Sequence, residues 1–155
     1  MLVDFNILPN DSRLWIYASD KELIPDHQRY ILNYFSNFIK SWTAHELPLK
    51  SGITILKNYF IVIALDEKEN MATGCSIDKL QNEVQEVEKI LSISLMNRMN
   101  IYCVIDNMIE CVSVNEFINK VNKETLFYDL TIKSKYELNN WLKKVSSGWC
   151  RRLLK

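Results

Sequence analysis

The chain has 155 residues, 48% hydrophobic and 25% charged, and its 19 basic and 19 acidic residues give a formal net charge of zero. This length and composition are typical of one globular domain, so we expect a single domain over residues 1–155. A balanced charge argues against a dedicated duplex-DNA-binding protein, although it does not exclude a local basic patch.

The four cysteines form no CxxC pair and have no histidine at a zinc-ligand spacing. The first residues lack the pattern of a secretory signal, and no apolar run approaches the length of a membrane span. We therefore expect a cytoplasmic protein with reduced thiols, without a structural metal, a cofactor or a membrane segment.

The first half of the chain predicts a strand, a helix and a hairpin. Residues 13–18 are rich in aromatic and β-branched residues, as in a strand. After Pro25, apolar and aromatic residues recur at spacings of three or four as far as His45, which predicts a helix that ends before Pro48. Residues 53–56 and 60–65 are too close in sequence for a parallel crossover, so they form a hairpin, and the second strand is apolar enough to be central.

The second half predicts a helix over residues 76–91 and a hairpin over 101–105 and 108–112, with Asp106-Asn107 at its turn. Cys103 and Cys111 lie on this hairpin, and we interpret them as core thiols rather than a disulfide. Capping boxes predict one helix from Ser113 to about residue 121 and another from Ser134 to about residue 145, with an edge strand over 126–132 between them.

This order predicts an α+β fold in which an antiparallel sheet carries both long helices on one face. The first six elements match a ferredoxin-like βαββαβ core, with C-terminal helices added to it.

Three segments, SRLWIYASD, WTAHELPLKSGITILKNYFIVIALDE and ATGCSID, resemble a family of small Bacteroidetes proteins that are often labelled "ABC transporter ATPase". The resemblance covers nearly the whole chain. The resemblance implies kinship but no mechanism. The sequence contradicts the ATPase label, because none of the three glycines stands in the GxxxxGK[ST] motif that a P-loop requires.

Cys75 is the best candidate nucleophile. It lies where the second long helix should begin, and the amides and dipole of a helix N-terminus stabilise a thiolate. With His45 as base and Asp78 nearby, the thiol could attack an acyl or phosphoryl centre. The alternative is that Gly74, Cys75 and Ser76 only start the helix.

Three other groups of residues could bind ligands. Trp42, His45 and Lys50 at a helix-to-strand corner, with Gly74 and Ser76, could line a site for a protein or a small anion. The acids Asp66, Glu67, Glu69 and Asp78 suit Mg²⁺ only if another strand adds a carboxylate, and otherwise form a solvated loop. A basic C-terminus suits single-stranded nucleic acid, or is a solvated end; its residues are Lys143, Lys144, Arg151, Arg152 and Lys155, with Trp141 and Trp149 between them.

We expect a non-enzymatic binding or adaptor domain that uses the Trp42–Lys50 corner and the Gly74–Asp78 turn. A thiol-dependent enzyme with Cys75 and His45 is the first alternative, and single-stranded nucleic-acid binding through the C-terminus is the second.

Overall fold

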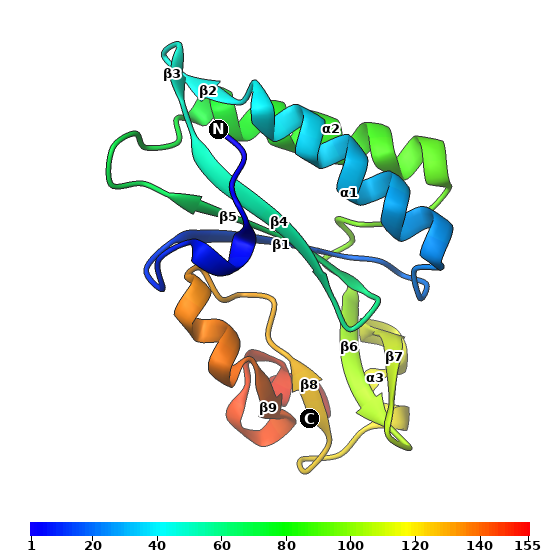
Figure 1. Cartoon of the computed structure of the whole chain (residues 1–155). Coiled ribbons are helices and arrows are strands. Elements are labelled where there is room, and N and C mark those ends of the chain that lie inside the picture. Colours follow the sequence, from blue (N-terminus) through cyan, green and yellow to red (C-terminus); the bar gives the residue numbers. More distant parts are fainter. The chain divides into compact units, whose positions relative to one another are not determined.

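The computed structural model describes residues 1–155, which form two compact units (Figure 1). Unit 1 comprises residues 1–96 and 133–136, and unit 2 comprises residues 97–132 and 137–155. Each unit has its own cluster of buried apolar side chains. The single domain that the sequence suggests stays a prediction.

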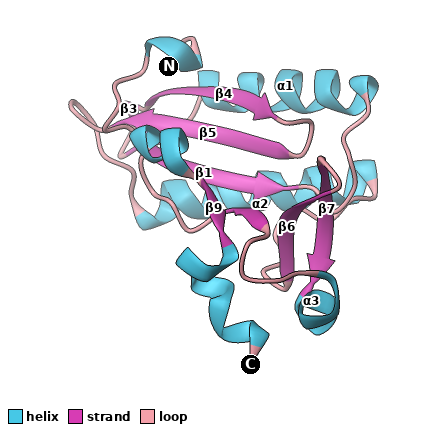
Figure 2. Cartoon of the chain, turned by 90° about the horizontal axis from the view of Figure 1, so that it is seen from below, coloured by secondary structure: helices cyan, strands magenta, loops and turns pink.

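Unit 1 is built on a three-stranded antiparallel sheet in the order β1-β5-β4 (Figure 2). The strands are β1 (Arg13–Ala18), β4 (Lys50–Leu56) and β5 (Phe60–Asp66). Every residue of β5 is buried, which confirms that the most apolar strand is central. The β4–β5 turn places Lys57 and Asn58 at positive φ, as a tight hairpin turn requires.

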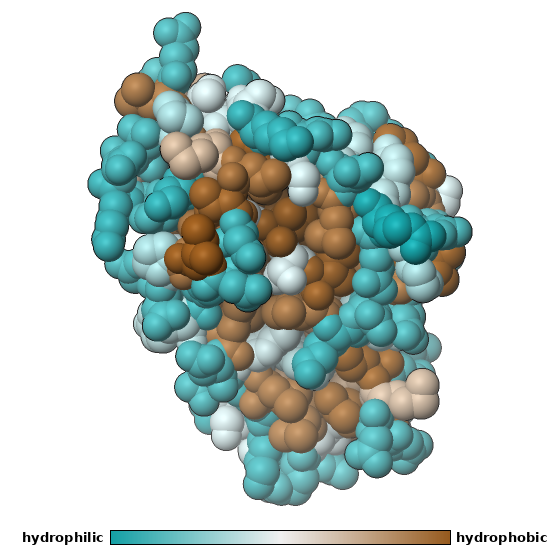
Figure 3. Space-filling view, in the orientation of Figure 1, coloured by the Kyte–Doolittle hydropathy of each residue, from teal (hydrophilic) through white to brown (hydrophobic).

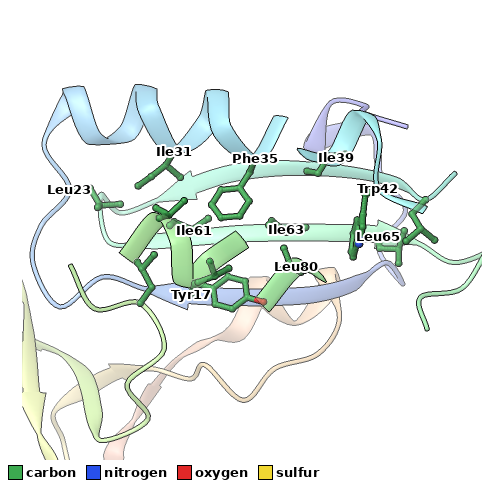
Figure 4. Close-up of a cluster of buried hydrophobic side chains, with 14 of the residues drawn as sticks. Tyr17, Leu23, Ile31, Phe35, Ile39, Trp42, Ile61, Ile63, Leu65 and Leu80 are labelled. Carbon is green, nitrogen blue, oxygen red and sulfur yellow. The ribbon is translucent and has the colours of Figure 1, made fainter. Parts of the chain in front are cut away.

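Two long helices, α1 (Pro25–Lys40) and α2 (Gly74–Leu91), lie on the same side of this sheet (Figure 1). Their apolar stripes meet the side chains that β5 directs toward them (Figure 4). The buried residues are Ile31, Phe35 and Ile39 from α1, Leu80, Val84 and Val87 from α2, and Ile61, Ile63 and Leu65 from β5. The prediction of an antiparallel sheet with both long helices on one face is confirmed for unit 1.

The first helix is shorter than predicted, because the chain leaves the helix at Lys40 and forms a small hairpin. Strands β2 (Thr43–Ala44) and β3 (Leu47–Pro48) pair across a turn in which His45 and Glu46 have φ values of 51° and 66°. Trp42 still reaches the core, with 2% of its surface exposed, but it does so from outside the helix. The helical spacing of apolar residues therefore continued past the true helix end.

The N-terminal residues are held against the edge of β4 and under Lys135. Val3 donates its amide to the Ser51 carbonyl at 2.9 Å. The next residues form a short 3₁₀ helix, Phe5–Ile7. The ammonium group of Lys135 donates to the carbonyls of Phe5 and Leu8 at 2.9 and 2.7 Å, so one side chain satisfies two backbone carbonyls at this short helix.

Unit 2 is a four-stranded antiparallel sheet in the order β7-β6-β8-β9, with one short helix, α3 (Val114–Lys120). The strands are β6 (Asn100–Ile105), β7 (Met108–Ser113), β8 (Leu126–Tyr128) and β9 (Leu142–Lys144). Asp106 and Asn107 both adopt positive φ at the β6–β7 turn, as predicted. The core of the unit contains Ile101, Cys103, Val112, Phe117, Phe127, Val145 and Cys150.

The βαββαβ core in one sheet is not confirmed, because β6 pairs with β7 and β8 in a sheet separate from β1. Strand β8 is shorter than the predicted 126–132 and is internal rather than an edge, since β6 and β9 flank it. Helix α3 forms where predicted, but its N-cap Ser113 makes no side-chain capping bond.

The predicted helix over residues 134–145 is wrong. The segment is a 3₁₀ helix, Lys135–Asn140, followed by β9 and two further 3₁₀ segments, Val145–Ser147 and Trp149–Leu154 (Figure 2). Lys135 and Tyr136 donate their backbone amides to the carbonyls of Ser12 and Asn10, which holds the start of this segment against residues 10–12. None of the helices is both long and apolar enough to cross a membrane.

Candidate functional site

The corner and the helix start that the sequence singled out are in direct contact. The indole nitrogen of Trp42 donates to the Ser76 carbonyl at 2.8 Å in a buried hydrogen bond. Asn70 donates its side-chain amide to the Pro48 carbonyl at 2.9 Å. These bonds tie the β2–β3 hairpin to the beginning of α2, so Trp42 and Ser76 are committed to holding the corner together.

Helix α2 begins at Gly74, two residues before the predicted start at Ser76. Thr73 is the N-cap, and its hydroxyl accepts the Ser76 amide at 3.2 Å. The Ser76 hydroxyl accepts the Thr73 amide at 2.7 Å, which completes a reciprocal capping box. Gly74 is exposed with open space beside it, so no close approach of another group explains the glycine.

The three residues of the thiol hypothesis are exposed, and no hydrogen bond joins them. Cys75 is the second residue of α2, and its free thiol is exposed. His45 lies at the tip of the β2–β3 hairpin, which projects as a hydrophilic point (Figure 3). Neither the Cys75 thiol nor the His45 imidazole makes a hydrogen bond or ion pair, and Asp78 is an exposed side chain on α2. The structure does not assemble a catalytic pair here.

Acidic residues at the end of β5 and just after it order the loop that leads to α2. The Asp66 carboxylate accepts the Lys68 amide at 3.1 Å and lies 3.9 Å from the Lys50 ammonium. The Glu67 carboxylate accepts the Ala72 amide at 3.0 Å. No group of three or more His, Cys, Asp or Glu side chains is placed to hold a metal ion.

The buried cysteines of unit 2 are placed as core side chains. Cys103 is opposite Glu110 in the β6–β7 register and Cys111 is opposite Tyr102, so the two cysteines face opposite sides of the hairpin. Burial raises the pKa of Cys103 to about 12 and that of Cys150 to about 11. Both groups are therefore protonated thiols at neutral pH.

The basic C-terminal run divides into two groups. Lys143 forms an ion pair with the buried Asp129 at 2.5 Å, and Lys144 pairs with Glu124 at 2.9 Å. Trp141 is buried against Tyr128 in an edge-to-face contact with ring centroids 4.7 Å apart. Lys143, Lys144 and Trp141 therefore belong to the structure of unit 2 and do not offer a free basic surface.

The remaining residues of that run surround a pocket of about 1000 Å³, which we call the basic pocket. Its cations come from the loop between α3 and β8 and from the last 3₁₀ segment. The lining residues are Lys123, Ser146, Ser147, Gly148, Trp149, Arg151, Arg152, Leu154 and Lys155. No acidic residue lines it.

Backbone contacts hold the basic pocket together. Ser146 donates its amide to the Lys123 carbonyl at 3.0 Å, which fixes the lysine beside the C-terminal segment. On that segment Cys150 is fully buried and Leu153 packs on the same core, three residues apart as a 3₁₀ helix requires. Trp149, Arg151 and Arg152 are consequently directed outward, and 38% of the Trp149 surface is exposed.

None of the four cations of the basic pocket, Lys123, Arg151, Arg152 and Lys155, forms an ion pair. The charge of Lys123 helps to lower the pKa of its neighbour Glu124, but the ammonium group that contacts the Glu124 carboxylate is that of Lys144. The sequence indicated the two arginines but not Lys123, because nothing in the spacing shows that its loop returns to the C-terminal segment.

A second, smaller pocket of about 500 Å³ lies at the C-terminal end of α2 and is lined by Gln85, Glu88, Lys89, Ser92, Ile93 and Ser94. Neither pocket is lined by the Trp42–Lys50 corner or the Gly74–Asp78 turn. In comparisons with known proteins, no family model, curated protein or solved structure matches the chain.

Proposed function

We propose that the protein is a non-enzymatic binding protein and that its ligand is an anion held in the basic pocket. The observation that supports this most directly is the set of four cations that share one pocket and form no ion pair with an acidic side chain. Like charges held together repel each other, and an anionic ligand would relieve that repulsion. The sequence-based choice of the Trp42–Lys50 corner is less suitable, since Trp42 is buried there and bonded to Ser76.

The proposal can be tested with inorganic polyphosphate, a polyanion without any other chemical feature. Isothermal titration at about 50 and about 200 mM salt should give an affinity that falls steeply as salt rises, because bound cations release counterions from the ligand. Replacing both arginines (R151Q/R152Q) should weaken binding at least tenfold, since two of the four charges are lost.

The matched control is Arg98→Gln. Arg98 is also exposed and without an ion-pair partner in unit 2, but it does not line the basic pocket. The Arg98→Gln variant should leave the affinity for polyphosphate unchanged. No binding of polyphosphate at low salt, or an equal loss in the Arg98 variant, would refute the proposal.

A thiol-dependent enzyme is the second candidate, and the exposure of Cys75 in the first turn of an 18-residue helix favours it. The test is the rate of alkylation of Cys75 between pH 5 and pH 9, in the wild type and in His45→Ala. A rate that has levelled off near neutral pH and is lost in the variant would support an activated pair. A thiol that titrates near its ordinary value of about 8.5 would rule it out.

We also propose that the protein is cytoplasmic and that it is related to the Bacteroidetes family that its segments resemble. That kinship does not extend to the ATPase label, since the chain has no phosphate-binding glycine loop. Phosphate release from ATP by the purified protein, above that of a heat-inactivated sample, would contradict this.

A further inference from the structure

We infer that the basic pocket binds a segment of single-stranded nucleic acid, with one base stacked on Trp149. This inference rests on the proposed function, because it names the class of anion that the pocket takes. It depends on a feature that anion binding alone does not need, the half-exposed aromatic ring among the cations.

The exposed indole ring of Trp149 is the first feature that favours a nucleic acid. Trp42 and Trp141 are buried in the cores of their units, where burial of an indole is stabilising. Trp149 differs, since it keeps 38% of its surface exposed although neighbouring residues of the same segment, Cys150 and Leu153, reach the core. An exposed indole between cations is the arrangement that proteins use to stack a base while the adjacent phosphates are neutralised.

The distribution of charge is the second step. Arg151 and Arg152 follow Trp149 on one segment, and Lys123 comes from a separate loop, so two segments contribute cations to the pocket. A backbone of successive phosphates can contact both segments at once. A compact anion such as a single phosphate could contact only part of the set.

The size of the pocket is the third step. Its volume of about 1000 Å³ is at the upper limit of the roughly 300–1,000 Å³ common for small-molecule sites. The hydroxyls of Ser146 and Ser147 add uncharged donors at the same wall. A site this large suits several nucleotides, and a duplex suits it less because its bases are already stacked and cannot reach the indole.

The test compares four ligands, each at the same total concentration of negative charge: an oligothymidylate, the same sequence as a duplex, inorganic polyphosphate and polyglutamate. Fluorescence anisotropy should show the oligothymidylate binding at least tenfold more tightly than the other three. If four cations each neutralise one phosphate, its log affinity should fall with log salt with a slope of about −3, and the R151Q/R152Q variant should reduce that slope to about −1.5.

Variants of Trp149 isolate the stacking. Trp149→Leu keeps an apolar side chain but removes the ring, and should weaken oligothymidylate binding about tenfold while leaving polyphosphate binding unchanged. Trp149→Phe restores a ring and should recover most of the loss. Circular dichroism and melting temperature show whether each variant is folded, and the phenylalanine variant keeps the test informative if the leucine variant is not.

The outcomes separate the two proposals. If polyphosphate or polyglutamate binds as tightly as the oligothymidylate, or if the duplex equals the single strand, the nucleic-acid inference fails while anion binding stands. Equal loss of both ligands in Trp149→Leu, with the fold intact, also overturns the stacking role. If none of the four ligands binds at low salt, the proposed function itself fails.

Discussion

Gly148 lines the basic pocket and lies directly over the core of unit 2, so adding a single methyl group there tests the structure sharply. A Cβ atom at this position would lie 2.1 Å from Cζ and 2.3 Å from Cε1 of Phe127, whose side chain is fully buried. Normal carbon contacts are about 3.5–4.0 Å, so either the ring or the segment must move by roughly 1.5 Å. Gly148 has φ of −109° and ψ of 173°, which any residue adopts, so the effect of Gly148→Ala is overpacking alone.

Overpacking of a well-packed core costs about 1–3 kcal/mol. We expect about 3 kcal/mol, because β8 is held between β6 and β9 and the Phe127 ring has little room to turn. At about 2–4 °C per kcal/mol, the melting temperature should fall by roughly 6–12 °C. Urea unfolding monitored by circular dichroism gives the free energy, and calorimetry gives the temperature.

Gly74→Ala is the matched control. A Cβ atom there meets nothing within 4 Å, and alanine in the first turn of α2 loses less backbone entropy on folding. This variant should be as stable as the wild type or up to about 1 kcal/mol more stable. The reasoning is refuted if Gly148→Ala lies within about 0.5 kcal/mol of the wild type, the range of an ordinary surface substitution.

A double-mutant cycle identifies the cause of the loss. Phe127→Leu removes the ring atoms that the new methyl group would meet, although it destabilises the core by itself. In that background Gly148→Ala should cost less than about 1 kcal/mol, so the two changes should be strongly non-additive. Additive costs would show that the methyl group acts on something other than the ring.

Three further predictions concern other parts of the structure. Lys135→Met removes the ammonium group that donates hydrogen bonds to carbonyls of the first 3₁₀ helix. The free energy of unfolding should fall by about 2 kcal/mol, and the amides of residues 7 and 8 should exchange faster with deuterium. Thr73→Ala removes the N-cap of α2 and should lower the unfolding free energy by about 1 kcal/mol in urea titrations. Burial alone would raise the pKa of Asp129, but hydrogen bonds from Lys143 and Thr131 outweigh it and lower the pKa. Its contribution to stability is therefore complete above about pH 4 and is lost as the pH falls further, so Asp129→Asn should flatten the acid limb of the stability profile.

The strands could be predicted where the local chemistry leaves one solution. Asp106 and Asn107 tolerate positive φ, and the structure places both there in a two-residue turn. Strand β5 is apolar on both faces, and the structure buries all of it. The corner after α1 could not be predicted, since Glu46 is not a residue type that favours positive φ. Trp42 also continues the helical spacing without being in the helix.

For the candidate site, the sequence identified residues that are neighbours in the chain and missed one that the fold brings to them. Arg151, Arg152 and Trp149 stood out because they adjoin in the sequence, and they do share the basic pocket. Lys123 was missed because a backbone hydrogen bond from Ser146, which the sequence does not reveal, brings its loop to that place. Lys143 shows the opposite mistake: the sequence suggested an unpaired cation, but the structure pairs it with Asp129.

A net charge of zero is therefore compatible with a strongly basic site, because ion pairs, and not the total numbers of acidic and basic residues, decide which cations remain unpaired. In unit 2 the lysines at positions 120, 143 and 144 are each matched by an acid, which neutralises them locally. The cations that remain free are mainly those around the basic pocket, where their mutual repulsion opposes folding. If these cations served only the fold, neutralising Arg151 should not stabilise the protein. If they form a ligand site, neutralising Arg151 should stabilise the protein and weaken ligand binding at the same time.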